Sequence, residues 1–130
     1  MSCWKSKSNH DKGEKMSGIE NEIKAKGLNA PRVTPADIIA SVSSEHYFTA
    51  YGGAKYGRIT RDEPQHSSAL KLLTFCVLVL DNGYTVTGES ACASPENFNA
   101  EIGQKIARQK AEEKIWPLLG FRLRDKLAGV

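Results

Sequence analysis

The sequence predicts an α+β domain, in which a small antiparallel sheet of about three strands is packed by a long C-terminal helix and a shorter N-terminal helix. Three observations support this: an Asn82-Gly83 pair between two β-rich runs, a helix start at Thr34-Pro35, and an apolar stripe with helical spacing after Pro95. Asn-Gly between apolar runs is the strongest short-range hairpin signal. We expect strands near residues 46–51, 69–80 and 84–92, and helices at residues 35–44 and 95–116.

The first thirty residues are expected to add little to the core. Residues 1–16 are rich in Lys, Ser, Asn and Gly, which is typical of a solvated flexible tail, with a basic arm for nucleic acid as the alternative. Ser17 can cap a short helix that ends near Gly27. We therefore divide the chain into a flexible tail at residues 1–30, able to hold a short helix, and a single domain at residues 31–130.

The next segment begins with a clear helix signal. Thr34 can cap the helix, Pro35 suits its first position, and Asp37 favours the positive end of the helix dipole. Residues 47–51 then have strand character. Residues 52–68 predict a long, partly basic loop, because they contain three glycines and a proline. The GGAKYG segment in this loop lacks the spacing of a phosphate-binding loop.

The predicted C-terminal helix starts at Ser94-Pro95, with Ser94 as its cap, and ends at Trp116 because Pro117 should break it. Residues 118–127 are expected to form a last turn or a short helix. Glu101–Lys105 and Arg108–Glu112 are oppositely charged pairs four residues apart. The apolar stripe consists of Phe98, Ile102, Ile106, Ala107, Ala111 and Ile115.

The length and composition of the chain limit the classes of function that it can have. A chain of 130 residues is one domain, and 18 Lys and Arg against 15 Asp and Glu give a net charge of +3, too weak to indicate a nucleic-acid binder. No apolar leader opens the sequence, and the apolar run at residues 72–80 is half a membrane span, so we expect a soluble, cytosolic protein. Cys76 and Cys92 are expected to be small buried side chains.

No catalytic constellation stands out. His10, His46 and His66 have no metal-ligand spacing, and no paired carboxylates suggest acid–base work. Ser94 is better explained as a helix cap than as a nucleophile. We therefore expect no enzyme activity, no cofactor and no metal.

Several uncommon motifs occur in order: Asn82-Gly83-Tyr84, Gly88-Glu89-Ser90-Ala91-Cys92, Pro95-Glu96-Asn97-Phe98, Ile102-Gly103 and Lys114-Ile115-Trp116-Pro117-Leu118. Together they resemble a family of small tailed-phage proteins over roughly residues 33–127. The resemblance to this family, which includes the Thoeris anti-defence protein of the first type, implies a sponge that binds a cyclic ADP-ribose isomer, or a cyclic oligonucleotide, without cleaving it. It also implies dimers or hexamers with pockets between subunits, acting in the host cytoplasm.

The ligand-binding candidates combine aromatic rings for a base with cations for phosphates. Residues 81–101 hold four acids and no bases, whereas residues 105–130 hold seven bases and three acids, so the ligand is expected near the basic end. For each cation, a solvated helix charge is the alternative. The alternative function is a phage protein-interaction or nucleic-acid-binding module that inhibits a host protein. The candidates are Tyr47, Tyr84, Asn97, Phe98, Lys105, Arg108, Lys114, Arg122 and Arg124.

Overall fold

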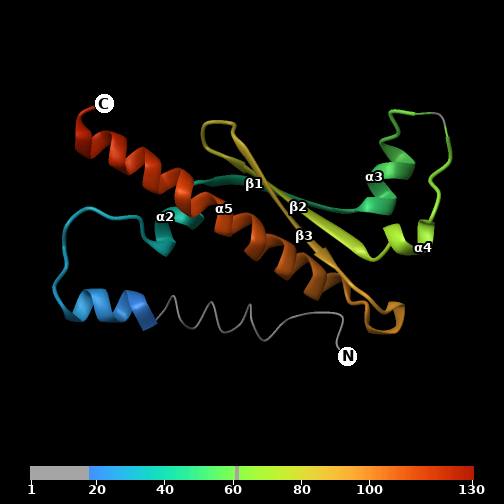
Figure 1. Ribbon diagram of the computed structural model, residues 1–130, viewed down its shortest axis with the longest axis horizontal. Coiled ribbons are helices and arrows are strands. Elements are labelled where there is room, and N and C mark those ends of the chain that lie inside the picture. Colours follow the sequence, from blue (N-terminus) through green and yellow to red (C-terminus); the bar gives the residue numbers. More distant parts are fainter. Residues whose placement is uncertain (1–17, 61) are drawn as a thin grey trace.

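A three-stranded antiparallel sheet forms the centre of the molecule (Figure 1). Its strands are β1 (Val42–Thr49), β2 (Leu73–Leu80) and β3 (Thr85–Ala91), in the spatial order β1-β2-β3. The computed structural model describes residues 18–60 and 62–130, and the structural statements below concern those residues. With the long helix α5 (Ala100–Ala128) and shorter helices beside the sheet, the predicted α+β class is confirmed.

The helix predicted at residues 35–44 starts as expected but is shorter. In α2 (Pro35–Ala40), the Thr34 hydroxyl accepts a hydrogen bond from the Asp37 amide (3.2 Å), and the Asp37 carboxylate accepts one from the Thr34 amide (2.9 Å). This reciprocal capping fixes the helix start. The helix ends at Ala40 because the chain enters β1 at Val42, whereas we had expected a helix to residue 44 and a strand from 46.

The Asn82-Gly83 hairpin is confirmed, with a different turn. The Gly83 amide donates to the Leu80 carbonyl, and the Leu80 amide donates to the Tyr84 carbonyl, both at 2.8 Å. These bonds define a three-residue loop, in which only Gly83 has a positive φ (86°). The two-residue turn predicted from Asn-Gly requires a positive φ at both residues. Asn82 instead uses its side-chain oxygen to accept from the Tyr84 amide at 3.0 Å.

Helix α5 covers one face of the sheet at very close range. Its buried residues at the contact include Ala107 and Ala111, both 0% exposed. Opposite them on β3 lies Gly88, where a Cβ atom would come within 2.0 Å of the Ala107 carbonyl oxygen and 2.5 Å of the Ala111 amide nitrogen. The helix backbone therefore approaches the strand backbone at a point that only glycine can occupy.

The predicted end of the long helix at Pro117 is wrong. Residues Pro95–Asn97 form a short 3₁₀ turn, and α5 begins at Ala100, after Asn99 caps it, and continues through Pro117 to Ala128. Proline inside a helix removes one backbone hydrogen bond and costs about 3 kcal/mol. Here Leu118 and Leu119 pack on the same core cluster as Ile38. Burial of these side chains offsets the cost, so the helix continues.

The expected loop at residues 52–68 is shorter than predicted, because helices occupy both its ends. They are α3 (Ala50–Tyr56), which also contains Tyr51, and α4 (Ser67–Leu70). Helix α4 also takes the first part of the strand expected from residue 69. Before α2, residues 18–25 are helical, as expected for a short helix, while Ser17 and the tail at residues 1–16 lie outside the described residues.

The second face of the sheet has no helix of the described chain packed across it. Along β2, the side chains of Thr74, Cys76, Leu78 and Leu80 are buried under α5, while the alternate residues are only partly covered. On that second face, the Phe48 and Phe75 rings stack with centroids 5.6 Å apart, and Phe48 remains 44% exposed. We call this surface the open face: Phe48, Phe75, Val77 and Val79, with His46 and Glu89 at its edges.

Candidate functional site

A hollow of about 230 Å³ lies where the β2–β3 hairpin meets the C-terminal half of α5. The hairpin contributes Tyr84, whose side chain is 57% exposed, and α5 contributes Arg122. An aromatic ring and a guanidinium thus line the same small cavity. Its full lining is Ser41, Leu80, Asp81, Asn82, Tyr84, Leu118, Leu119 and Arg122.

Local structure explains why these side chains meet. The amide of Asp81 donates to the Ser41 carbonyl at 3.0 Å, which joins the hairpin to the end of α2. The Asp81 carboxylate accepts from the Ser43 hydroxyl at 2.9 Å. Arg122 reaches the hairpin only because α5 continues past Pro117. The same feature that contradicted the predicted helix end therefore builds the hollow.

A second hollow, of about 310 Å³, adjoins the first and shares Ser41, Asp81, Leu119 and Arg122 with it. We call the two together the hairpin groove. Each is near or below the lower limit of ordinary small-molecule pockets, but adjoining hollows can hold two parts of one ligand. The second hollow also has Arg32, Val33, Asp37, Ala40, Leu123 and Lys126 in its lining.

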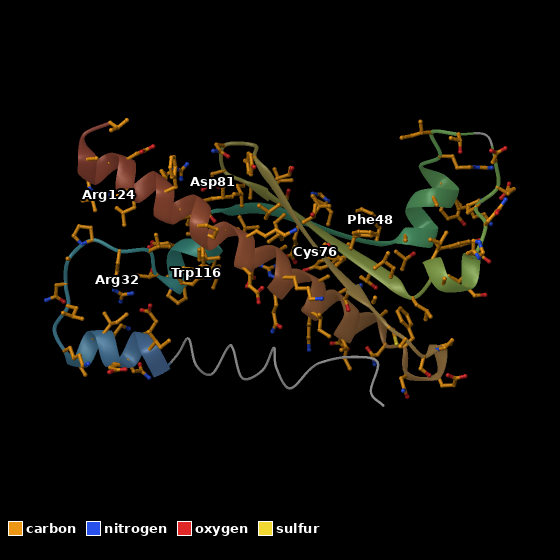
Figure 2. The ribbon with its side chains drawn as sticks, in the orientation of Figure 1. Arg32, Phe48, Cys76, Asp81, Trp116 and Arg124 are labelled. Atoms are coloured by element: carbon orange, nitrogen blue, oxygen red, sulfur yellow. The ribbon has the colours of Figure 1, made fainter. Side chains whose placement is uncertain are left out.

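The hairpin groove has more available positive than negative charge. Asp37 and Asp81 are the carboxylates of its lining, and each already accepts a hydrogen bond from a neighbouring group. Arg122 and Lys126 form no ion pair with any carboxylate of the described residues. Two cations are therefore free to meet an anion from solution. Figure 2 shows Asp81 beside α5 and Arg32 between the helix of residues 18–25 and α2.

The structure brings together two of the nine predicted ligand-binding residues, Tyr84 and Arg122. Arg108 lies elsewhere on α5, where it forms ion pairs with Glu45 of β1 and with Glu112, at 2.7 Å from Nε to Oε1. The second of these was predicted from spacing. The guanidinium of Arg108 therefore links α5 to β1, and a phosphate would have to displace two carboxylates.

Tyr47 is mostly enclosed between the sheet and α5. It packs against the main core cluster, opposite Cys76 in the strand register. Burial raises the pKa of its phenol to about 12, and the neighbouring Cys76 adds to the shift. Burial likewise raises the pKa of the Cys76 thiol. The position of Tyr47 is that of a core residue beside the sheet, away from the lining of the hairpin groove.

The remaining candidates are scattered. Phe98 is half-buried against Cys92 and Ile106. Lys105 lies 3.8 Å from Glu101, the other predicted pair on α5. Asn97, Lys114 and Arg124 are exposed, and Figure 2 shows Arg124 near the C-terminal end of α5. None of these side chains lines the hairpin groove.

Several lining residues were not among the predicted ligand-binding residues, including Arg32, Ser41, Asn82 and Lys126. The basic surplus after residue 105 was a signal for Lys126. No pattern connects Arg32 with the end of α5. The described residues contain no cluster of three or more His, Cys, Asp or Glu suited to a metal ion. Within the same residues, no helix combines the length and apolar character needed to cross a membrane.

These features define a small α+β domain with a cation-lined groove between its hairpin and its long helix. Residues 33–127 match the model of the phage protein family described as N4 Gp49/phage Sf6 gene 66, and the chain belongs to this family. The expected resemblance to a phage family is thereby confirmed over the expected span. Comparison with curated proteins and comparison with solved structures each found no match.

Proposed function

We propose that this phage protein is an anti-defence protein that binds a cyclic nucleotide immune signal in the host cytoplasm and sequesters it without cleavage. A cyclic ADP-ribose isomer is the ligand class that the family resemblance favours. Such a ligand presents an adenine base and a pyrophosphate. A binding site for it needs an aromatic face and cationic forks close together.

The observation that carries the proposal is the placement of Tyr84 and Arg122 in one hollow. The exposed Tyr84 ring can stack on a base, because the hydrogen bonds that hold the hairpin involve the backbone of Tyr84 and not its ring. Arg122, which has no carboxylate partner among the described residues, can form two parallel hydrogen bonds to a phosphate. The two groups suit the two ends of a nucleotide.

The lining of the first hollow also suits binding without chemistry. It contains one hydroxyl side chain other than Tyr84, that of Ser41, and this hydroxyl donates to the Ile38 carbonyl at 2.7 Å. A hydroxyl becomes a nucleophile through an adjacent base. The one carboxylate of this lining, Asp81, already accepts a hydrogen bond from the Ser43 hydroxyl at 2.9 Å, and the lining includes no histidine, cysteine or lysine. We therefore propose a binding protein and not an enzyme.

We further propose that the protein is a homo-oligomer that pairs through the open face. Strand β2 is apolar on both sides, which is typical of a strand covered on both faces, yet α5 covers only one. The face spans roughly 400 Å² in projection from the usual strand spacing and rise. Its side chains add further accessible surface, so two such faces reach the lower range of stable interfaces.

The edges of the open face favour a second copy as the occupant. His46 lies on β1 opposite Val77 of the central strand, and Glu89 lies on β3 opposite Phe75. The two polar residues therefore stand at opposite edges of the open face. A two-fold axis that runs parallel to β2, in the plane between two such faces, brings β1 of one copy over β3 of the other. His46 of each copy then lies at the same edge of the interface as Glu89 of its partner, two residues apart along the strand direction, so polar side chains meet at this edge.

Calorimetric titration tests the proposed ligand. The purified protein is titrated with cyclic ADP-ribose, its isomers and cyclic oligonucleotides, and the bound compound is released by heating and identified by mass spectrometry. We expect one cyclic nucleotide to bind and to return intact. Tyr84→Ala and Arg122→Ala should each weaken binding at least tenfold, as for a lost stacking or charged contact. The control Lys110→Ala removes a charge from an exposed position of α5 outside the groove. Flat titrations, or a released product of altered mass, would overturn the proposal.

A further inference from the structure

Arg32 is held by a carboxylate of this same chain. Its Nη1 and Nη2 atoms donate to Oε1 and Oε2 of Glu20 at 2.7 and 2.8 Å. Both side chains are well shielded, with exposed fractions of 27% for Arg32 and 16% for Glu20. This two-pronged contact docks the helix of residues 18–25 beside the start of the domain (Figure 2).

Glu20 remains ionised at neutral pH. The Arg32 guanidinium holds the pKa of this carboxyl below its usual value, mainly through the two hydrogen bonds. Glu20 and Arg32 therefore form a full ion pair under ordinary conditions. The fork geometry of the contact is the one that arginine also uses for phosphate.

Arg32 also lines the hairpin groove, in the hollow that contains Arg122 and Lys126. Three cations from two segments far apart in the sequence, Arg32 and the end of α5, thus meet at one cavity. Two of them, Arg122 and Lys126, have no carboxylate partner among the described residues, and the third is occupied by Glu20. The two acids of the lining, Asp37 and Asp81, are engaged with Thr34 and Ser43.

We propose that Arg32, Arg122 and Lys126 form a phosphate subsite in the hairpin groove, and that Glu20 is an internal competitor for it. A phosphate that enters the hollow takes over the Arg32 fork, and Glu20 is released. This inference rests on the proposed function for the identity of the natural ligand, but the subsite itself is defined by anion chemistry. Glu20 and Arg32 both precede Val33, where the family match begins, so this ion pair lies outside the matched region.

Two consequences follow. In the free protein Glu20 occupies Arg32, and an anion must displace it in order to bind. The apparent affinity for an anion is therefore lower than that of the same subsite without Glu20. Binding also removes the contact that docks residues 18–25. The occupied subsite is therefore coupled to loosening of that helix, although the helix lies outside the groove.

Inorganic pyrophosphate is the probe for the test, with the full-length protein and constant ionic strength. We expect Glu20→Gln to bind it about fivefold more tightly than the wild type, the size of a partly exposed ion pair. Arg32→Ala should weaken binding and cancel the gain of Glu20→Gln in the double variant. Arg32→Lys, which keeps the charge but loses the fork, should lie between the wild type and Arg32→Ala.

Glu22→Gln is the matched control, because Glu22 lies on the same helical segment and pairs with Lys26 at 2.9 Å instead of Arg32. It should leave the pyrophosphate affinity within twofold of the wild type. Equal gains in the two glutamine variants would show a general charge effect and overturn the competitor role. An Arg32→Ala variant with wild-type affinity would overturn the subsite.

Hydrogen exchange gives a second readout. Saturating pyrophosphate should speed amide exchange in residues 18–27 of the wild type, and Glu20→Gln should show that faster exchange without the probe. Unchanged or slower exchange on binding would contradict the release of Glu20. Pyrophosphate binding without any cyclic nucleotide binding would refute the proposed function and leave this subsite standing. Cyclic nucleotide binding that is unchanged in Arg32→Ala would refute the subsite and leave the proposed function standing.

Discussion

Gly88 of β3 lies directly against the backbone of Ala107 in α5, so closely that a Cβ at residue 88 would come within 2.0 Å of the Ala107 carbonyl oxygen. The neighbour is helix backbone, which cannot rotate away as a side chain can. Gly88→Ala should therefore push α5 off the sheet and destabilise the protein by about 2–4 kcal/mol, at or above the usual cost of overpacking. Denaturant unfolding measures the change.

Gly120→Ala is the control for Gly88. Gly120 also lies in α5, but a Cβ there meets nothing within 4 Å. Alanine is a better helix former than glycine, so this variant should gain about 0.5–1 kcal/mol. Equal effects of the two substitutions would show that the close contact at Gly88 does not limit the packing.

Pro117 offers a second stability prediction. It lies inside α5 with its ring exposed, so its replacement loses little packing. Pro117→Ala restores a backbone donor and should raise the free energy of unfolding by about 1–3 kcal/mol. Thermal unfolding checks this as a higher midpoint. A lower midpoint would mean that the proline sets the packing of the last turns of α5.

The buried phenol of Tyr47 makes stability depend on pH in the alkaline range. Its pKa is about 12 in the folded protein, mainly through burial, and about 10 in an unfolded chain. Folding thus favours the neutral phenol. The resulting contribution to the free energy of unfolding is complete below pH 10 and is lost between pH 10 and 12. The free energy of unfolding should fall less steeply in this window for Tyr47→Phe than for the wild type.

The control for this titration is Tyr56→Phe, since the Tyr56 side chain is 81% exposed. It should retain the wild-type slope between pH 10 and 12. A Tyr47→Phe variant with that same slope would contradict the assignment to Tyr47.

The proposed pairing of open faces predicts a change of oligomeric state. Phe48→Glu places a charge on the exposed part of the face, and two copies would bring these charges together in an apolar interface. Sedimentation should show a dimer or larger oligomer for the wild type and a monomer for the variant. Tyr56→Glu introduces the same charge at an exposed site off the sheet and should leave the oligomer intact. A wild type that is monomeric at all concentrations would refute the proposal, and a monomer that captures a host protein through this face would favour the interaction module instead.

Local signals predicted most of the fold. The capping pair Thr34–Asp37 and the Asn82-Gly83 turn involve residues within four positions of one another, so a short segment of sequence contains both partners of each contact. The failure at Pro117 has a tertiary cause. The proline signal is local and unfavourable, whereas the packing of Leu118 and Leu119 on the core depends on residues of α2 and β2 that no local pattern places beside them.

The candidate site was predicted only in part for the same reason. The aromatic character of Tyr84 and the charge of Arg122 could be read from the sequence, but their meeting depends on where the hairpin and α5 cross. Spacing identified Glu112 as a partner of Arg108, while Glu45 on β1 was not foreseeable. Arg32 lies between the short helix predicted after Ser17 and the helix start at Thr34, and nothing local relates it to the end of α5.

The uncovered apolar side of β2 and the late position of α5 also bear on synthesis. The β2–β3 hairpin is complete at Ala91, but its cover is a helix of 29 residues that starts at Ala100. At ordinary translation rates this helix takes a few seconds to make. Until α5 has been made and has docked, both sides of the hairpin are uncovered, and its edges can pair with other chains. Rapid high-level expression should therefore favour aggregation of nascent chains, and slower synthesis should favour soluble protein.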